Sequence, residues 1–248
     1  MSQLTITGNS HTIALNQGLR QVPEAAGVTV FGLGAGVYET EAFSATEAGR
    51  VVLTQPVYAE NLVRFTGQDH IAPDRLWGIC MGTHNPRLYG DRIWTGAAAP
   101  SALAGDGQRP VSSGLIDRMA DEDQRHIRAF LTQLKDAGIR FFVISAPPVR
   151  ADHQNIVRGA DPEVLLEIDR RSRARFRGFL DGLGVDFVDF PPETADAQGL
   201  LRPEYAAGLL KNGKRDPHHG NAEYGALMLR RIDDGVALAV DARALPLR

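Results

Sequence analysis

The sequence is poor in cysteine and contains no long apolar run. Cys80 is the only cysteine among 248 residues, so no internal disulfide can form, and its apolar neighbours predict a buried strand position. No apolar segment approaches the roughly 20 residues that span a bilayer. The first residues also lack a basic region followed by an apolar stretch. These absences predict a cytoplasmic protein that has no membrane partner.

The chain also lacks a strong excess of charge of one sign. Its formal net charge of −3 gives no electrostatic footprint for nucleic acid. The arginine-rich run 170–177 follows an acidic segment on one expected helix, which favours a solvated helix face over a phosphate-binding patch. An apolar fraction of 43% is ordinary for a globular protein, and the length suits one large α/β domain over residues 1–248.

Apolar, β-rich segments alternate along the chain with segments of helical periodicity. The predicted strands are 4–7, 28–33, 75–81, 139–145 and 185–190, with a short edge strand at 50–54. The predicted helices are 11–20, 56–66, 114–137, 162–183 and 221–233. This alternation predicts a three-layer α/β/α sandwich with a central, mostly parallel five-stranded sheet. Two long irregular stretches, 82–113 and 191–218, follow strands and should emerge at the carboxyl edge of the sheet, where ligands bind.

The first predicted strand stops abruptly, and a helix follows with no room for a longer connection. The turn is Gly8-Asn9-Ser10-His11, so Ser10 would stand at the carboxyl end of a strand. It would also lie beside the unpaired N–H groups of a helix N-terminus. Ser10 can be interpreted as a helix cap, which is a common role for serine, or as a catalytic nucleophile.

A serine nucleophile needs a neutral imidazole as its base, and that imidazole needs a carboxylate to fix its tautomer. Asp216 and His219 supply both groups, three residues apart and just before the last predicted helix. The positive end of that helix dipole would keep His219 neutral. A second Asp-x-x-His pattern, Asp123 with His126, lies inside a predicted helix and is interpreted as a surface pair.

The segment Gly82-Thr83-His84-Asn85 follows the third strand of the predicted sheet. An oxyanion that forms on an acyl carbonyl needs preorganised donors, which are often an asparagine amide and backbone N–H groups. Asn85 is therefore a candidate donor. The alternative interpretation is that Asn85, which precedes Pro86, only makes a turn.

Together these segments resemble the SGNH, or GDSL-type, hydrolases over nearly the whole chain. Residues 8–11 are similar to the Gly-Asp-Ser motif of that family, with Asn9 in place of the aspartate. Residues 82–85 are similar to its oxyanion Gly-x-Asn segment, and 145–149 to the proline-containing end of its penultimate strand. Residues 216–219 match its Asp-x-x-His motif.

The resemblance implies a flavodoxin-like SGNH hydrolase fold and a serine esterase. Ser10 would be the nucleophile, His219 the base and Asp216 the residue that orients the base. The oxyanion would be bound by the Ser10 amide, a glycine and Asn85.

This chain departs from the family pattern at the oxyanion segment. The family asparagine lies two residues after the glycine, at the position of His84 here, so Gly82, His84 and Asn85 are all candidate oxyanion or substrate-binding residues. The second glycine donor stays open among Gly32, Gly34 and Gly36. The resemblance implies a small-molecule or saccharide ester as substrate, including an O-acyl group on a carbohydrate, and no cofactor or metal. A saccharide O-acyltransferase would use the same three residues.

Three other functions compete with this interpretation. The segment 32–37 is similar to the Gly-x-Gly-x-x-Gly motif of dinucleotide-binding sites. It lacks the last glycine of that motif and the helix that should follow it. A carbohydrate-binding module could keep the fold and lose the catalytic activity, but the presence of Ser10, Asp216 and His219 together is evidence against that interpretation. Zinc could be held by a set of residues at the strand ends: His70, His84, Asp216, His218 and His219. Because neighbouring side chains on an extended turn diverge, we expect only His219 to face Ser10, with His218 at the rim of the substrate site.

Overall fold

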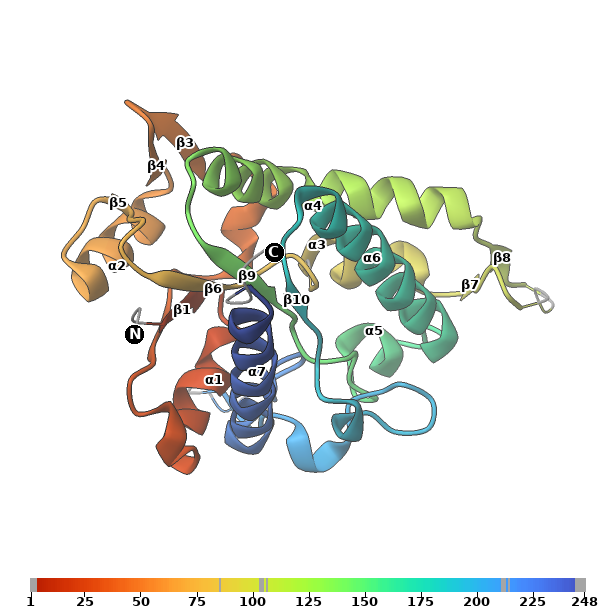
Figure 1. The fold of residues 1–248 in the computed structure, drawn as a ribbon. Helices are drawn as coiled ribbons and strands as arrows, with labels where there is room; N and C mark the ends of the chain where they lie inside the picture. Colours follow the sequence, from red (N-terminus) through yellow and green to blue (C-terminus); the bar gives the residue numbers. More distant parts are fainter. Residues whose placement is uncertain are drawn as a thin grey trace.

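The computed structural model describes residues 4–84, 86–102, 105, 107–210, 213 and 215–243. At its centre lies a five-stranded sheet with the strand order β10-β9-β6-β1-β2 (Figure 1). These strands are β1 (Leu4–Gly8), β2 (Thr29–Gly32), β6 (Leu76–Cys80), β9 (Phe141–Ile144) and β10 (Phe187–Val188). All four pairings between neighbours are parallel, which confirms the predicted sheet.

Helices cover both faces of this sheet (Figure 1). One face carries α1 (Thr12–Gly18) and α7 (Ala222–Arg243), and the other carries α2 (Pro56–Thr66), α4 (Ser113–Asp136) and α6 (Pro162–Leu183). All five predicted helices are present, and α7 continues beyond its predicted end at residue 233. The predicted three-layer sandwich is therefore confirmed. None of the described helices is both long and apolar enough to cross a membrane.

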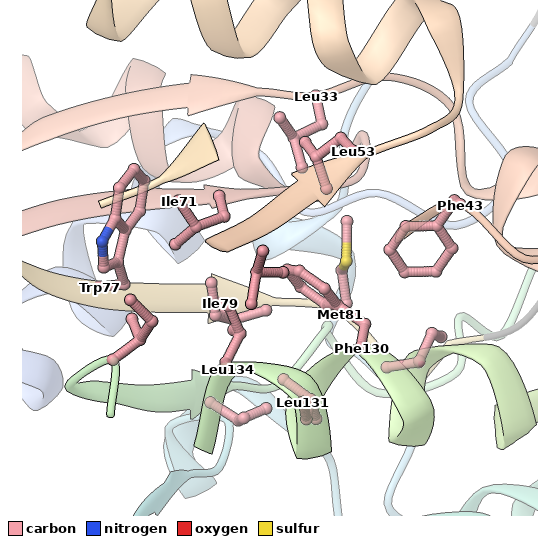
Figure 2. Close-up of a cluster of buried hydrophobic side chains, with 14 of the residues drawn as sticks. Leu33, Phe43, Leu53, Ile71, Trp77, Ile79, Met81, Phe130, Leu131 and Leu134 are labelled. Atoms are coloured by element: carbon pink, nitrogen blue, oxygen red, sulfur yellow. The ribbon is translucent and has the colours of Figure 1, made fainter. Parts of the chain in front are cut away.

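The central strands send alternate side chains into two cores, one on each face of the sheet. Phe31 of β2 points into the core under α2, α4 and α6, whereas its neighbour Val30 points into the core under α1 and α7. In Figure 2, Trp77 and Ile79 of β6 lie against the side chains of α4. Strands covered on both faces must be apolar on both faces, as the sequence pattern indicated.

Local signals in the sequence fix where the main helices begin and end. The Gln55 side chain caps α2 by accepting the N–H of Val57 at 2.7 Å, and Asp161 caps α6 by accepting the N–H of Glu163 at 2.9 Å. In each case a proline occupies the first helical position, where its missing N–H costs nothing. Gly184 ends α6 in the left-handed conformation, with φ of 62°.

The predicted edge strand exists, but it does not belong to the central sheet. β4 (Arg50–Leu53) lies between β3 (Ser44–Glu47) and β5 (His70–Ile71) in a separate antiparallel sheet. The reason is local: Ala48 and Gly49 both have positive φ, so they form a tight two-residue hairpin turn that pairs β4 with β3.

The two stretches that we expected to be irregular contain short elements. Residues 82–113 include α3 (Pro86–Gly90), η4 (Arg92–Trp94), β7 (Ala97–Ala98) and β8 (Arg109–Pro110), and residues 191–218 include η5 (Pro192–Thr194) and η6 (Pro203–Tyr205). The remaining short helices are η1 (Leu19–Gln21), η2 (Pro23–Ala25), η3 (Gly36–Thr40) and α5 (Gln154–Val157). Elements of two to five residues are too short to produce a recognisable hydrophobic period.

The arginine-rich run on α6 is only partly the solvated face that the sequence predicted. Arg171 lies at the surface and pairs with Asp117 of α4 at 2.7 Å. Arg173, in contrast, is 6% exposed and pairs with Asp169 at 2.8 Å and Asp189 at 3.2 Å. The prediction was wrong for Arg173 because its two carboxylate partners allow a guanidinium to be buried, and one of them comes from a distant segment.

Candidate active site

β1 ends at a glycine because the backbone there touches the neighbouring strand. Gly8 has φ of +155°, and a Cβ at this position would collide with the carbonyl group of Cys80 on β6. The Asn9 N–H donates to the same carbonyl oxygen at 3.2 Å. The chain therefore leaves the sheet at Asn9, and Ser10 follows at the carboxyl edge of β1.

Asn9, rather than Ser10, holds the start of α1. The Asn9 side-chain oxygen accepts the N–H of His11 at 3.0 Å. The Asn9 carbonyl oxygen accepts the N–H of Thr12 at 3.1 Å and its hydroxyl at 2.7 Å. The Ser10 hydroxyl is engaged elsewhere, with His219, so the interpretation of Ser10 as a helix cap is wrong.

Ser10, His219 and Asp216 lie in a continuous hydrogen-bonded line. Ser10 Oγ is 2.8 Å from His219 Nε2. On the other side of the imidazole ring, Nδ1 is 2.8 Å from Asp216 Oδ2 and 3.0 Å from Oδ1. A carboxylate that accepts from Nδ1–H leaves Nε2 unprotonated, so Nε2 can accept the hydroxyl proton of Ser10.

The electrostatic setting keeps Asp216 ionised. Burial alone would raise the pKa of this carboxyl, but hydrogen bonds from His219 and His218 outweigh burial and hold the pKa well below its usual range. The donors are the His219 ring, the His219 N–H at 2.9 Å and the His218 N–H at 3.1 Å. Asp216 can therefore orient the ring and stabilise an imidazolium without taking up the proton itself.

The loop that carries Asp216 and His219 is tied to neighbouring segments. The Asp216 N–H donates to the carbonyl oxygen of Gly208 at 2.9 Å, and the Ala207 N–H donates to that of His219 at 2.9 Å. Arg150, which is 2% exposed, donates to the carbonyl oxygen of Ala207 at 2.8 Å. These bonds fix the approach of the loop to α7, which begins three residues after His219.

Two histidine rings contact that of His219, and two further histidines extend the cluster. The ring centroid of His218 lies 4.2 Å from that of His219, and the centroid of His11 lies 4.8 Å from it. His84 stacks on His218 at 5.0 Å and lies 6.5 Å from His153. Burial lowers the pKa of His218 and of His153 to about 4, and it lowers the pKa of His11 and of His84 well below 6.5. All four rings are therefore uncharged near neutral pH.

The expected divergence of His218 from His219 is wrong. Asp216 Oδ1 accepts the backbone N–H groups of both residues, which curls the segment into a tight turn. The two rings consequently lie against each other.

The sequence matches no protein-family model, and no curated protein resembles it. Solved structures do resemble it. A GDSL-like lipase from Bacteroides thetaiotaomicron has a TM-score of 0.54 and 13% identity over 95% of this chain and 88% of that chain. A carbohydrate acetylesterase from Sinorhizobium meliloti has a TM-score of 0.51 and 13% identity over 96% of this chain and 100% of that chain. The chain has the SGNH hydrolase fold.

Within this SGNH fold, the predicted oxyanion segment follows β6. Gly82 has φ of +93° and its backbone lies against the ring of Phe176, while its carbonyl oxygen accepts from the Gln124 amide at 3.0 Å. His84 is 6% exposed and lies within the histidine cluster described above. Asn85 lies outside the described residues. Of the three candidates, the structure places His84 in the group of rings around His219.

The zinc set that we considered from the sequence is only partly assembled in this SGNH fold. His70 lies on β5, where its Nδ1 is 2.7 Å from Asp69. Among the residues that the structure describes, the group with ligand atoms close together is His11, His218 and His219. Sequence reasoning gave His11 no role, although its place directly after Ser10 was a signal. The discarded Asp123 lies on α4, where its carboxylate accepts the N–H of Leu88 at 2.7 Å.

Sequence reasoning also missed Glu39, a buried acid beside the turn that carries Ser10. Glu39 lies on η3 and is 3% exposed. Burial raises its pKa from 4.5 to about 8, and the nearby side chains of Asn9 and Tyr58 offset part of the rise. The carboxyl is therefore protonated at pH 7 in the folded protein.

The substitution Glu39→Gln should make the folded protein more stable at pH 8. Between pH 4.5 and 8 the unfolded chain releases the Glu39 proton while the folded protein retains it, so wild-type stability falls as the pH rises through this range. Glutamine cannot ionise and removes this dependence. Chemical unfolding at pH 8 should show a gain on the order of a few kcal/mol, which shrinks towards pH 4.5.

The matched control for that experiment is Glu41→Gln, because Glu41 is an exposed carboxyl in the same segment. Its replacement should leave the pH dependence of unfolding close to that of the wild type. A Glu39→Gln protein whose stability falls with pH as steeply as the wild type would show that Glu39 is already ionised at pH 7.

Proposed function

We propose that this protein is a serine hydrolase that cleaves acyl esters through a covalent acyl-enzyme. One observation carries the proposal: Ser10 Oγ lies 2.8 Å from His219 Nε2, and Asp216 holds Nδ1 of the same ring at 2.8 Å. The first distance suits direct proton transfer between a nucleophile and its base, and the second suits a carboxylate that orients that base.

In the proposed reaction, Ser10 Oγ attacks the acyl carbonyl carbon and its proton passes to His219 Nε2. His219 then gives this proton to the alcohol oxygen as the ester bond breaks. Water next attacks the acyl-serine and gives a proton to His219 Nε2; the bond from the acyl carbon to Ser10 Oγ then breaks, Oγ takes this proton back from His219, and the carboxylic acid is released. Asp216 stabilises the imidazolium in both halves of the cycle.

The oxyanion donors are also part of the proposal. The backbone N–H of Ser10 makes no hydrogen bond to the part of the chain that the structure describes, so it is available to a developing oxyanion. We propose that Asn85 or His84 supplies a second donor, as the sequence resemblance implied. The buried position of His84 beside His218 supports a place at the edge of the substrate site.

We propose an O-acylated saccharide as the substrate class. The support is the likeness to proteins described as carbohydrate acetylesterases, among them a family member from Sinorhizobium meliloti with a TM-score of 0.50, 16% identity and coverage of 96% of this chain and 98% of that chain. A saccharide acyltransferase would use the same acyl-enzyme but would pass the acyl group to a sugar hydroxyl. Incubation with an aryl acetate and an unacylated oligosaccharide separates the two, because a hydrolase releases acetate and a transferase forms an acetylated sugar.

Inhibitors should separate the serine mechanism from a metal-dependent one. A fluorophosphonate should label the protein once and abolish hydrolysis of p-nitrophenyl acetate, because it traps a serine that is activated by a neighbouring base. EDTA should leave the rate of the metal-free protein unchanged, because no step of the proposed reaction passes through a metal ion. Intact-protein mass spectrometry and the initial rate measure the two effects.

The label should be absent from the Ser10→Ala protein, which serves as the control. Loss of activity in EDTA that is restored by added zinc would contradict the serine mechanism and support a metal-dependent one.

A further inference from the structure

Three imidazole rings, one of them that of His219, lie close together next to Ser10. One ligand nitrogen from each of His11, His218 and His219 lies within 4.8 Å of the other two. The ring centroids of His11 and His218 are 5.6 Å apart, and each ring also contacts that of His219. We call these three residues the histidine triplet.

One member of the histidine triplet has a buried nitrogen without a partner. His11 is 5% exposed, and its Nδ1 has no hydrogen-bond partner among the described residues. A buried polar atom in this condition has lost its hydrogen bonds to water without gaining others from the described part of the protein, which destabilises the fold. Because the His11 ring lies against the rings of His218 and His219, this unpartnered nitrogen points to a ligand that the protein can bind there.

We propose that the histidine triplet binds one divalent transition-metal ion, such as Zn²⁺, and that the bound ion switches ester hydrolysis off. The effect on hydrolysis rests on the proposed function of Ser10 and His219, whereas the binding itself does not. Imidazole nitrogen is a preferred ligand of zinc, and three protein ligands with an open fourth position form a familiar zinc site.

The inhibition follows because zinc binding and acceptance of the Ser10 proton both need the same lone pair of His219. His219 Nδ1 is held by Asp216, so the ion must bind Nε2, the nitrogen that contacts Ser10 Oγ. An ion on Nε2 occupies the lone pair that would accept the Ser10 proton. Metal binding and general-base catalysis therefore exclude each other: a metal–nitrogen bond replaces the hydrogen bond between Ser10 and His219, and no covalent bond of the protein changes.

The surroundings of the histidine triplet favour an ion once it has bound. Asp216 lies behind His219 and accepts from its Nδ1, the arrangement in which a carboxylate orients a metal-binding histidine and makes it a stronger ligand. In a tetrahedral zinc site with Zn–N bonds of about 2.0–2.1 Å, two ligand nitrogens stand about 3.4 Å apart. The ligand nitrogens of the histidine triplet lie within 4.8 Å of one another, so each pair needs to approach by about 1.4 Å at most, which side-chain rotation can supply.

The test measures binding and activity separately on the full chain. Zn²⁺ is titrated into the metal-free protein against a chromophoric chelator, and hydrolysis of p-nitrophenyl acetate is followed over the same range. The wild type should bind one Zn²⁺ and lose at least tenfold in rate at saturation. His11→Gln and His218→Gln should each weaken zinc binding at least tenfold. At the zinc concentration that inhibits the wild type, each variant should keep the hydrolysis rate that it has without metal.

Two controls keep the outcome clear. His70→Gln removes a histidine from β5, outside the histidine triplet, and should bind zinc and be inhibited like the wild type. Ser10→Ala should bind zinc as the wild type does, since it keeps all three rings. If Ser10→Ala hydrolyses esters at the wild-type rate, the proposed function is wrong. The zinc titration still tests the proposed metal site, because it does not depend on ester hydrolysis.

Two results would overturn the inference. Unchanged zinc affinity in both His11→Gln and His218→Gln would show that any bound zinc lies elsewhere. A rise in the hydrolysis rate with added zinc would show that the ion supports the reaction instead of blocking it.

Discussion

Ser10→Ala is expected to lower kcat for ester hydrolysis by roughly 10³-fold or more. The substitution removes the oxygen that lies 2.8 Å from His219 Nε2, and no acyl-enzyme can then form. His219→Ala should cost a similar factor, because the hydroxyl loses its base. Asp216→Asn should cost somewhat less, because the ring keeps its place but loses the charge that fixes its tautomer.

His218→Ala is the neighbouring control for these variants, and it should be much milder than His219→Ala. The His218 ring contacts the same cluster but is not in line between Ser10 and Asp216. Initial rates with p-nitrophenyl acetate, together with a thermal unfolding curve for each variant, separate lost chemistry from lost structure. A Ser10→Ala protein with the wild-type rate would place the nucleophile elsewhere.

Gly225→Ala should destabilise the fold by about 3 kcal/mol or more. Gly225 is buried on α7, and a Cβ there would overlap the carbonyl group of Ala14 on α1. Gly18 of α1 makes the reciprocal approach to the backbone of Gly225 and Ala226, so the two helices touch backbone to backbone. Since backbone cannot turn aside as a flexible side chain can, α1 and α7 must separate. Chemical unfolding measures the loss.

Gly178→Ala is the matched control for the Gly225 variant. Gly178 is an exposed glycine on α6, and a Cβ there would meet no atom within 4 Å. Alanine should stabilise that helix by about 0.5–1 kcal/mol, because it has a higher helix propensity than glycine. If Gly225→Ala is as stable as the wild type, α1 and α7 are not in the close contact described above.

Much of the fold was predictable because its signals are local. The strands of the central sheet are short β-rich runs that end at a turn or a polar residue, and α2, α4 and α6 each have a capping residue at their start. The positions of Ser10 and of Asp216 with His219 were predictable for the same reason. Each lies in a short segment between a strand or loop and a helix, so the neighbouring residues alone place it.

The rest of the site depends on contacts between distant segments, which local patterns do not contain. Nothing near Glu39 in the sequence indicates that η3 buries its carboxyl beside Asn9. His153 joins the histidine cluster only because α5 packs close to the segment after β6. The burial of Arg173 likewise requires Asp189, which follows β10. Periodicity predicts which face of an element is apolar, but it does not predict which polar groups meet inside the fold.

The line from Ser10 to His219 joins residues 209 positions apart in the chain. A ribosome that adds about 5–20 residues per second needs about 10 to 40 seconds to pass from one to the other. Throughout that time the nascent chain exposes a serine that has no base and is chemically inert. In the proposed mechanism the Ser10 hydroxyl gains its base only when α7 docks against α1, so the onset of ester hydrolysis would report the docking of these two helices.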